Sequence, residues 1–300
     1  MDALIVGTGA LGTLFAARLT QAGHSVTMLG TWKAGLEALR SKGARIVNAY
    51  GSESIYKVRV ADDARECMEM KHALVLVKAW QTERAAHQLK ECLAGDGLAV
   101  TLQNGLGSYE TLIRSLGPAR VALGTTTAGA TLLGPGLVRA GGEGIISIER
   151  HPAIGPLEEA LKSSGFNLHI VDDAQSLIWG KLVINAAINP LTAILGIPNG
   201  DLLAKTASRE LMSALACEAA EVATAEHIHL PFSDPVSAAE DVARKTAANH
   251  SSMLQDIRRG APTEIDAICG AVVEAGKKHN VSTPANWACW HLIKALAGTG

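Results

Sequence analysis

The chain lacks an excess of charge of either sign. Its 300 residues carry 27 Lys and Arg against 29 Asp and Glu, a formal net charge of −2. A protein that binds nucleic acid over much of its surface is normally strongly basic. The balance therefore argues against nucleic acid as a partner, and only a local basic pocket stays compatible with it.

We expect neither a membrane-spanning helix nor a signal peptide in this sequence. Its longest apolar run covers residues 182–197, shorter than the roughly 20 residues that a membrane helix needs. Asn185, Asn189 and Pro190 interrupt this run. The N-terminus carries an acid at Asp2 and then a glycine-rich turn, where a signal peptide would have basic residues and an apolar stretch. We expect no membrane partner.

Disulfide scaffolds and metal-binding motifs are missing as well. The cysteines are odd in number and never form a CxxC pair: Cys67, Cys92, Cys217, Cys269 and Cys289. Free thiols in a reducing cytoplasm fit this pattern. The ten histidines show no HxxxH or HExxH spacing and no accompanying acid cluster, so no metal site is expected.

What the sequence does contain is a globular composition, 48% hydrophobic and 19% charged, long enough for two domains. Its first half alternates short apolar runs with helical spacing. Strands are expected over 3–6, 25–29, 73–77 and 98–102, and helices over 10–21 and about 80–93. Further strands are expected over 45–47 and 55–60, with β-structure at the far edge over 125–148 that ends in a strand at 144–148. Such alternation predicts an α/β fold with a parallel, doubly wound sheet.

The second half has a different pattern. After a strand-like segment at 168–171, the acidic pair Asp172–Asp173 offers a suitable helix start. Helical stretches follow over 175–195, 208–227, 235–248, 264–279 and 284–297. We therefore predict a dinucleotide-binding domain over 1–171 and an all-helical substrate-binding domain over 172–300. The apolar helices over 264–297 can either pair in a homodimer or pack within their own domain.

A glycine-rich turn opens the chain. It follows the first predicted strand, opens the first predicted helix and reads Gly7, Thr8, Gly9, Ala10, Leu11 and Gly12. In a GxGxxG turn, glycine permits a tight turn, approach of the backbone to a pyrophosphate, and close helix–sheet packing. The helix N-terminus offers unpaired N–H groups to the phosphates. The motif predicts dinucleotide binding. The alternatives are a purely structural glycine-rich turn and a methyltransferase loop.

The end of the second strand indicates which dinucleotide binds. An NAD site usually has a carboxylate there for the ribose 2′-hydroxyl, whereas an NADP site has none and adds cations. Here no acid occurs until Glu37. Thr31 and Lys33 are candidates for contacting a 2′-phosphate, although Lys33 also fits a solvated lysine at a helix start. The missing acid favours NADPH.

Four further segments carry distinctive residues: 77–81 (VKAWQ), 103–107 (QNGLG), 181–185 (KLVIN) followed by 189–193 (NPLTA), and 251–256 (SSMLQD) with 263–266 (TEID). Together with the glycine turn they resemble the ketopantoate reductase (2-dehydropantoate 2-reductase) family, in order and approximate spacing. The resemblance covers nearly the whole chain. It implies a Rossmann domain, a helical domain, and an active site in the cleft between them.

The resemblance also implies residue roles. Lys181 would be the catalytic lysine, Glu264 the acid that binds the substrate, and Asn104 a residue beside the nicotinamide ribose and the substrate. Four residues would hold the substrate's hydroxyl and carboxylate: Asn185, Asn189, Asn249 and Ser252. Lys78 and Gln81 would bind the adenosine end of the cofactor. The family often has an arginine where this chain has Thr31, which leaves the 2′-phosphate contacts to another residue such as Lys33.

Chemistry alone supports part of this assignment. Lys181, Asn185 and Asn189 are four residues apart on a helix that is otherwise apolar, so they form a polar stripe that needs partners. A ligand would supply them, and so would a polar network between helices. A lysine near a ketone stabilises the developing oxyanion and delivers a proton, which makes Lys181 a candidate general acid.

Asn104 and Glu264 each have a structural alternative. Asn104 follows a strand, where doubly wound sheets bind ligands, but an asparagine before glycine is also a common turn. Glu264 is expected to open a helix, where an acid favours the N-terminal dipole in the absence of any ligand.

These observations predict NADPH-dependent reduction of 2-dehydropantoate to pantoate in pantothenate biosynthesis by a cytoplasmic oxidoreductase. Two alternatives stay open: reduction of another branched or hydroxylated 2-oxo acid on the same scaffold, and a non-catalytic NADP(H)-binding redox sensor.

Overall fold

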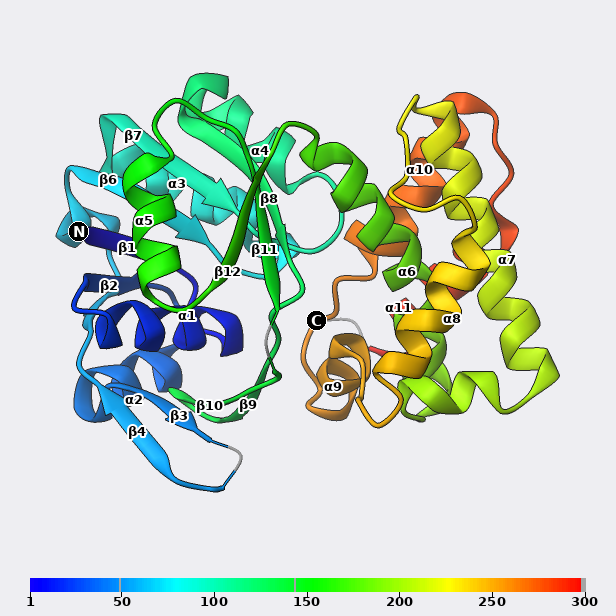
Figure 1. The fold of residues 1–300 in the computed structure, drawn as a ribbon, viewed down its shortest axis with the longest axis horizontal. Coiled ribbons are helices and arrows are strands. Elements are labelled where there is room, and N and C mark those ends of the chain that lie inside the picture. Colours follow the sequence, from blue (N-terminus) through cyan, green and yellow to red (C-terminus); the bar gives the residue numbers. More distant parts are fainter. Residues whose placement is uncertain (49, 143, 298–300) are drawn as a thin grey trace. The chain divides into compact units, whose positions relative to one another are not determined.

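The computed structural model describes residues 1–48, 50–142 and 144–297 (Figure 1). The chain divides into two compact units. The first consists of Met1–Gln103 and Ser108–Ala174, and the second of Asn104–Gly107 and the chain from Gln175 onward. This division separates the short segment 104–107 from the strand that leads into it, whereas the predicted 1–171 domain keeps the two together.

An eight-stranded sheet forms the centre of the first unit, in the order β12-β11-β8-β7-β6-β1-β2-β5. Its strands are β1 (Asp2–Val6), β2 (Ser25–Leu29), β5 (Arg59–Ala61), β6 (Met70–Val75), β7 (Leu93–Thr101), β8 (Val121–Thr126), β11 (Ile145–Glu149) and β12 (Asn167–Val171). Neighbouring strands are parallel except β11 and β8, which are antiparallel. The predicted doubly wound sheet is confirmed.

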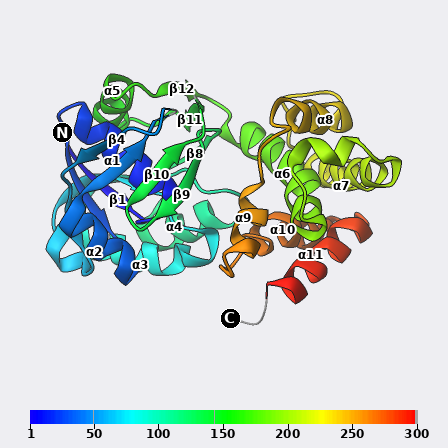
Figure 2. The ribbon, with the colours of Figure 1, turned by 90° about the horizontal axis from the view of Figure 1, so that it is seen from below.

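Helices cover both faces of this sheet: α1 (Ala10–Gln21), α2 (Lys33–Lys42), α3 (Thr82–Cys92), α4 (Ser108–Leu116) and α5 (Gly155–Ser163). Side chains of β1 contribute alternately to two hydrophobic cores, because successive residues of a strand point to opposite faces of the sheet. Ala3 and Ile5 pack in a core with residues of α1 and α5. Leu4 and Val6 pack in another with residues of α3 and α4. Figure 2 shows these helix pairs on opposite sides of the strands.

A second sheet of four strands lies in the first unit, in the order β4-β3-β10-β9. It contains β3 (Ala44–Val47), β4 (Glu53–Tyr56), β9 (Ala130–Gly134) and β10 (Leu137–Ala140). The prediction of one strand over 55–60 is wrong, because the chain leaves β4 in this sheet and enters β5 in the main one. Similarly, the β-structure expected over 125–148 divides between both sheets.

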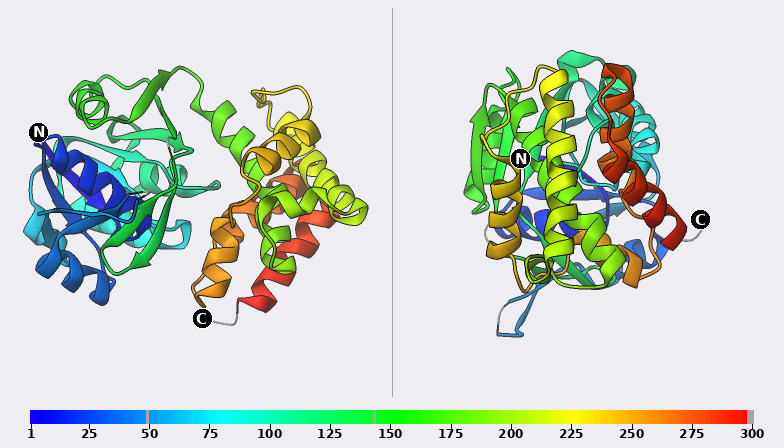
Figure 3. Two further views of the ribbon diagram at one scale, coloured as in Figure 1. Left: turned by 60° about the horizontal axis from the view of Figure 1, so that its bottom comes forward. Right: turned by 90° about the vertical axis from the view of Figure 1, so that its right-hand side faces the viewer.

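The second unit is built from helices: α6 (Ala174–Leu195), α7 (Thr206–Ala225), α8 (Pro235–Lys245), α9 (Ser252–Arg258), α10 (Ala271–His279) and α11 (Pro284–Leu296). Between 175 and 297 the described chain contains no strand, as predicted. Helix α7 packs against both α10 and α11, and the right-hand view of Figure 3 shows α7 and α11 side by side. Packing within the unit thus accounts for part of their apolar surface, and pairing with a second copy stays a prediction.

Helix α6 is long and apolar enough to cross a membrane by length and composition alone. In the structure, 67% of its most apolar stretch is buried inside the protein. Leu182, Val183 and Ala186 lie in one core with residues from α7, α8, α9 and α11. A helix that its own protein covers on most sides is typical of a domain core.

Short helices were harder to predict than long ones. No helix is predicted over the full length of α2, α4, α5 or α9, which contain 10, 9, 9 and 7 residues. The predicted helix over 264–279 is wrong at its start, because residues Asp266–Gly270 form a π-helical turn before α10 begins. Glu264 lies in the bend that precedes this turn and therefore does not open a regular helix.

Candidate active site

The glycine turn connects β1 to α1, and its three glycines have three different surroundings. Gly7 has a φ of +127°, and a Cβ there would lie 2.9 Å from the Leu76 carbonyl group. A Cβ at Gly12 would lie 2.1 Å from the Gly7 carbonyl oxygen. At Gly9, by contrast, a Cβ would have no described atom within 4 Å. Gly7 and Gly12 are therefore required for the fold, while Gly9 leaves room at the helix N-terminus for a ligand.

The end of β2 lies beside this turn, because β1 and β2 are parallel neighbours. A Cβ at Gly30 would lie 2.7 Å from the Thr8 methyl group, so this glycine allows Thr8 to pack against the strand end. Thr31 and Lys33 are both exposed, and Lys33 is the first residue of α2. This placement fits a 2′-phosphate contact and fits a solvated helix-start lysine equally well.

Lys78 and Gln81 follow β6, which pairs with β1 on its other side. The Gln81 Oε1 accepts a hydrogen bond of 3.3 Å from the Lys78 backbone N–H, within a short 3₁₀ turn at Ala79–Gln81. Both side chains are partly buried. The carboxyl ends of β1, β2 and β6 thus bring the predicted cofactor residues of the first unit to one edge of the sheet.

Asn104 lies in the segment 104–107, which hydrogen bonds join to the rest of the second unit. Its Nδ2 donates to the Glu264 Oε2 at 3.1 Å, and the Leu106 backbone N–H donates to the Ala267 carbonyl oxygen at 3.0 Å. Gly105, between them, has a φ of +78° and a Cβ there would lie 2.2 Å from that carbonyl oxygen. The Asn-Gly pair therefore makes the turn expected of it and also presents its amide to a carboxylate.

Lys181 lies one helical turn before Asn185 on α6 and interacts electrostatically with Glu264. Burial among protein atoms lowers the pKa of the Lys181 amine to about 8, and the Glu264 carboxylate opposes this shift. The Glu264 residue is itself only 6% exposed. A buried carboxylate that interacts with a lysine of lowered pKa and with an amide is a candidate site for binding a small polar molecule and transferring a proton to it.

The other polar residues of α6 differ in burial. Asn185 is partly buried and Asn189 is only 8% exposed. The hydroxyl of Thr192, one turn later, lies 3.0 Å from the Asn189 carbonyl oxygen and 2.7 Å from the Ser251 hydroxyl. Ser251 in turn accepts the Leu254 N–H at 3.1 Å and so caps α9. This network fixes the start of α9 against α6.

Asn249 and Ser252, the remaining predicted substrate residues, flank the cap and are both exposed. The Asn249 carbonyl accepts the Asn199 N–H at 2.9 Å, which ties this turn to the chain after α6. Ser252 is the first residue of α9. The exposed side chains are accessible to a ligand, while the buried Ser251 holds the helix.

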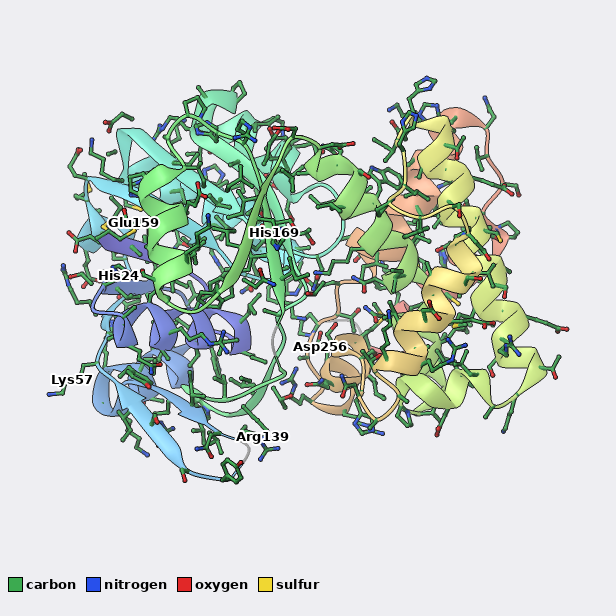
Figure 4. The ribbon with its side chains drawn as sticks, viewed as in Figure 1. His24, Lys57, Arg139, Glu159, His169 and Asp256 are labelled. Carbon is green, nitrogen blue, oxygen red and sulfur yellow. The ribbon has the colours of Figure 1, made fainter. Side chains whose placement is uncertain are left out.

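Two arginines near the end of α9 have defined partners. Arg259 pairs at 2.9 Å with the buried carboxylate of Asp256, which is labelled on α9 in Figure 4. The Arg258 guanidinium donates at 3.0 Å to the Gly196 carbonyl, just beyond α6. Arg258 thus holds the C-terminal end of α9 near the end of α6. Because both arginines have partners within the protein, we do not assign either of them to ligand binding.

Sequence reasoning missed the residues that support this site. Thr192 and Ser251 belong to the segments 189–193 and 251–256, but the sequence predicts no role for either of them. The Ala267 carbonyl group carries no signal in the sequence. Thr192 and Ser251 share a plain signal, because small hydroxyl residues at 0% and 6% exposure require hydrogen-bond partners.

No cluster of three or more His, Cys, Asp or Glu side chains suited to a metal ion occurs among the described residues. The chemistry available here is that of one lysine, one carboxylate and several amides and hydroxyls.

Comparisons with known proteins agree with these features. Two family models match the chain, "Ketopantoate reductase PanE/ApbA" over residues 3–153 and "Ketopantoate reductase PanE/ApbA C terminal" over 173–297. The chain is 33% identical to the 2-dehydropantoate 2-reductase of Halobacterium salinarum, with 100% of both proteins covered. It is 35% identical to that of Archaeoglobus fulgidus, covering 97% of this chain and 96% of the relative.

Solved structures show the same likeness. A PanE/ApbA family ketopantoate reductase from Ralstonia eutropha JMP134 has a TM-score of 0.92 at 29% identity, covering 99% of this chain and 98% of the other. A D-mandelate dehydrogenase solved with NADH and anilino(oxo)acetate has a TM-score of 0.93 at 26% identity, with the same coverage. Matched by family models over both of its halves and by full-length relatives, the chain belongs to the ketopantoate reductase family.

Proposed function

We propose that this protein reduces 2-dehydropantoate to pantoate with NADPH, a step of pantothenate and coenzyme A biosynthesis. The observation that carries the proposal is the Lys181 amine, whose pKa of about 8 suits proton donation near neutral pH, next to the buried Glu264 carboxylate. Full-length relatives in archaea and bacteria are named 2-dehydropantoate 2-reductase.

The reaction adds a hydride and a proton to the ketone. A reduced nicotinamide supplies the hydride to C2 when it is bound. The carbonyl oxygen then becomes an alkoxide, and the Lys181 ammonium donates the proton that converts it to the new hydroxyl. Before transfer, the same ammonium stabilises the developing negative charge on this oxygen. Product release leaves a neutral amine that regains its proton from solvent.

Glu264 and Asn104 position the substrate in this proposal. The Glu264 carboxylate accepts a hydrogen bond from the primary hydroxyl of 2-dehydropantoate, and the Asn104 amide fixes the carboxylate through the 3.1 Å bond between them. Four polar residues on α6, on α9 and in the turn before α9 would hold the substrate's hydroxyl and carboxylate: Asn185, Asn189, Asn249 and Ser252. The substrate class follows from this set: a 2-oxo acid that also carries a hydroxyl.

The first unit fits a nicotinamide dinucleotide. Gly7 and Gly12 form a tight turn that a side chain would disrupt, and Gly9 leaves the helix N-terminus accessible to a pyrophosphate. NADPH is favoured over NADH because the end of β2 and the first turn of α2 carry no acid, and Lys33 is exposed there. We propose Thr31 and Lys33 as contacts of the 2′-phosphate and Lys78 and Gln81 as contacts of the adenosine.

We also propose that residues 1–171 bind the cofactor and 172–300 the substrate, with the segment 104–107 as the part of the chain that serves both. A cytoplasmic location is proposed on the basis of the five cysteines, all of which are free thiols.

A direct assay tests the function. The purified protein is mixed with 2-dehydropantoate and either NADPH or NADH, and oxidation is followed at 340 nm. We expect a higher kcat/KM for 2-dehydropantoate than for 2-oxoisovalerate, which lacks the hydroxyl, and than for phenylglyoxylate, the oxo acid of mandelate. A preference for either of those acids would contradict the proposed substrate, and a preference for NADH would contradict the cofactor. NADPH binding with no oxidation for any acid would instead indicate a redox sensor.

A further inference from the structure

Just after Glu264 the chain forms a π-helical turn, Asp266–Gly270. The Gly270 N–H donates to the Ile265 carbonyl at 3.0 Å, one residue further back than in an α-helix. Such turns are rare in proteins and are frequent at functional sites. This turn occurs next to the carboxylate on which the proposed function depends, so the contacts that hold the turn in this shape matter for the site.

This turn determines how the segment 104–107 is bound. Its Ala267 carbonyl accepts the Leu106 N–H, and the Glu264 carboxylate just before it accepts the Asn104 amide. The Glu264 carbonyl meanwhile accepts the Ile268 N–H at 3.1 Å, so the backbone of Glu264 is itself part of the turn. A change in the turn would therefore move both Glu264 and Asn104.

The side chain of Trp290 on α11 bridges the two ends of the turn. Its indole Nε1 donates to the Asp266 Oδ1 at 2.7 Å, at the first residue of the turn. At the last residue, Gly270, a Cβ would lie only 2.9 Å from the Trp290 Cε2, so the indole rests directly on the glycine backbone. The Lys294 ammonium lies 3.2 Å from the same Asp266 oxygen and 5.5 Å from the centre of the indole.

We propose that Trp290 and Asp266 are positioning residues of the active site, which hold the π-helical turn in the shape that presents Glu264 and Asn104. The Asp266 side chain is 66% exposed, and Trp290 lies on α11. In this proposal neither residue contacts the substrate, and both act by holding the turn. The inference rests on the proposed function for its kinetic consequences, whereas its structural part is independent of any activity.

The first test is Trp290→Phe, which keeps a ring over Gly270 and removes the indole N–H. We expect KM for 2-dehydropantoate to rise about 2- to 10-fold, the effect of one lost hydrogen bond, while KM for NADPH stays unchanged. The pKa seen in the kcat/KM profile should also fall, because a Glu264 that is held less firmly raises the pKa of Lys181 less.

The matched control is Trp287→Phe, one helical turn earlier on α11. Trp287 is 51% exposed, and its ring lies 4.2 Å from that of His291, which in turn meets the Trp290 ring edge-on at 5.0 Å. Because phenylalanine keeps a ring at position 287 and leaves the Trp290 indole N–H in place, this variant should keep the wild-type KM and pH profile. Asp266→Asn retains an oxygen that accepts the indole N–H and should stay near the wild type. Asp266→Ala should match Trp290→Phe, and the double variant should be no worse than either single variant.

Hydrogen–deuterium exchange separates this inference from the proposed function. In Trp290→Phe the Leu106 amide should exchange faster than in the wild type, whereas in Trp287→Phe it should not. If exchange at Leu106 rises in Trp290→Phe but the wild-type protein reduces no 2-oxo acid, the structural role of Trp290 is supported and the proposed function is wrong. Unchanged exchange at Leu106 together with an unchanged KM in Trp290→Phe would overturn the inference.

Discussion

The two units build their candidate sites from different materials. In the first unit the site consists of backbone, with glycines at Gly7 and Gly12 where any side chain would meet a carbonyl group within 3 Å. In the second unit the site consists of side chains, among them a buried carboxylate and an amine of lowered pKa. The first arrangement recognises a ligand common to many enzymes, and the second supplies chemistry that a backbone lacks.

This difference has a consequence for substitutions. A backbone site depends on sterics, so a change there either leaves the turn intact or disrupts it. A side-chain site depends on charge and hydrogen bonding, so changes there alter rate and affinity by graded amounts while the fold persists. The predictions below test this contrast, beginning with the largest expected effect.

Removing the amine of the second unit should separate chemistry from cofactor binding. In Lys181→Ala we expect kcat for 2-dehydropantoate to fall about 10²- to 10⁴-fold, because the alkoxide loses its proton donor and its stabilising charge. The dissociation constant of NADPH, measured by fluorescence titration, should stay within the wild-type range. Near-normal turnover would remove Lys181 from the mechanism.

The glycine turn offers the opposite experiment. In Gly12→Ala the new Cβ would lie 2.1 Å from the Gly7 carbonyl oxygen, so we expect a loss of about 1–3 kcal/mol in the free energy of unfolding. In Gly9→Ala the Cβ has space, so stability should be retained while NADPH affinity falls about 10-fold, since the methyl group occupies the approach to the helix N-terminus.

Thermal unfolding and NADPH titration of both variants check this pair. Gly23→Ala is an unsuitable control, because Gly23 has a φ of +87°, whereas Gly95 has a negative φ and space for a Cβ outside the turn. Gly95→Ala should match the wild type in both measurements. Equal losses of stability in Gly9→Ala and Gly12→Ala would mean that the two glycines do not have separate roles.

The pH profile tests the charge arrangement of the second unit. Because burial lowers the pKa of Lys181 from 10.5 to about 8, the proton donor is lost as pH rises, and kcat/KM for reduction should decline above about pH 8. In Glu264→Gln the opposing carboxylate is gone, so the decline should begin at lower pH. A decline that begins at higher pH in this variant would contradict the electrostatic link between the two residues.

The same lowered pKa has a consequence for stability. Between about pH 8 and 10.5 the unfolded chain binds a proton at Lys181 that the folded protein does not, so this residue makes the fold more stable as pH rises. Near neutral pH a buried ammonium is unfavourable. Lys181→Met combined with Glu264→Gln, which leaves no buried carboxylate without its charge partner, should therefore unfold at a higher temperature than Glu264→Gln alone at pH 7.

The strands and helices of the first unit could be predicted from the sequence better than the contacts that hold the candidate site of the second unit in place. Strand 25–29 and helix 10–21 match β2 and α1, because apolar periodicity and a glycine turn are local signals. The π-helical turn was missed, since the contacts that favour it come from Trp290, distant in sequence. The same holds for Thr192 and Ser251, 59 residues apart, whose hydroxyls meet only once the helices pack. Lys181, Asn104 and Glu264 came from motif resemblance, and their roles stay predictions.

The smallest expected effect concerns the contact that fixes α9 to α6. Thr192→Val keeps the side-chain shape but removes the hydroxyl, which leaves Ser251 without this buried partner at 2.7 Å. We expect a loss of about 1 kcal/mol in the free energy of unfolding. We also expect KM for 2-dehydropantoate to rise about 2- to 5-fold, because the proposed substrate residues Asn249 and Ser252 flank the Ser251 cap.

The matched control for that experiment is Thr224→Val on α7, which removes an exposed hydroxyl that donates to the Ala220 carbonyl at 3.0 Å. It should leave both stability and KM close to the wild type. If Thr192→Val lowers stability without changing KM, the contact supports the fold alone and the substrate is held elsewhere. If KM for 2-dehydropantoate rises as expected while NADPH affinity stays constant, the packing of α9 against α6 affects substrate binding in the second unit. The same packing then has no effect on cofactor binding by the glycine turn of the first unit.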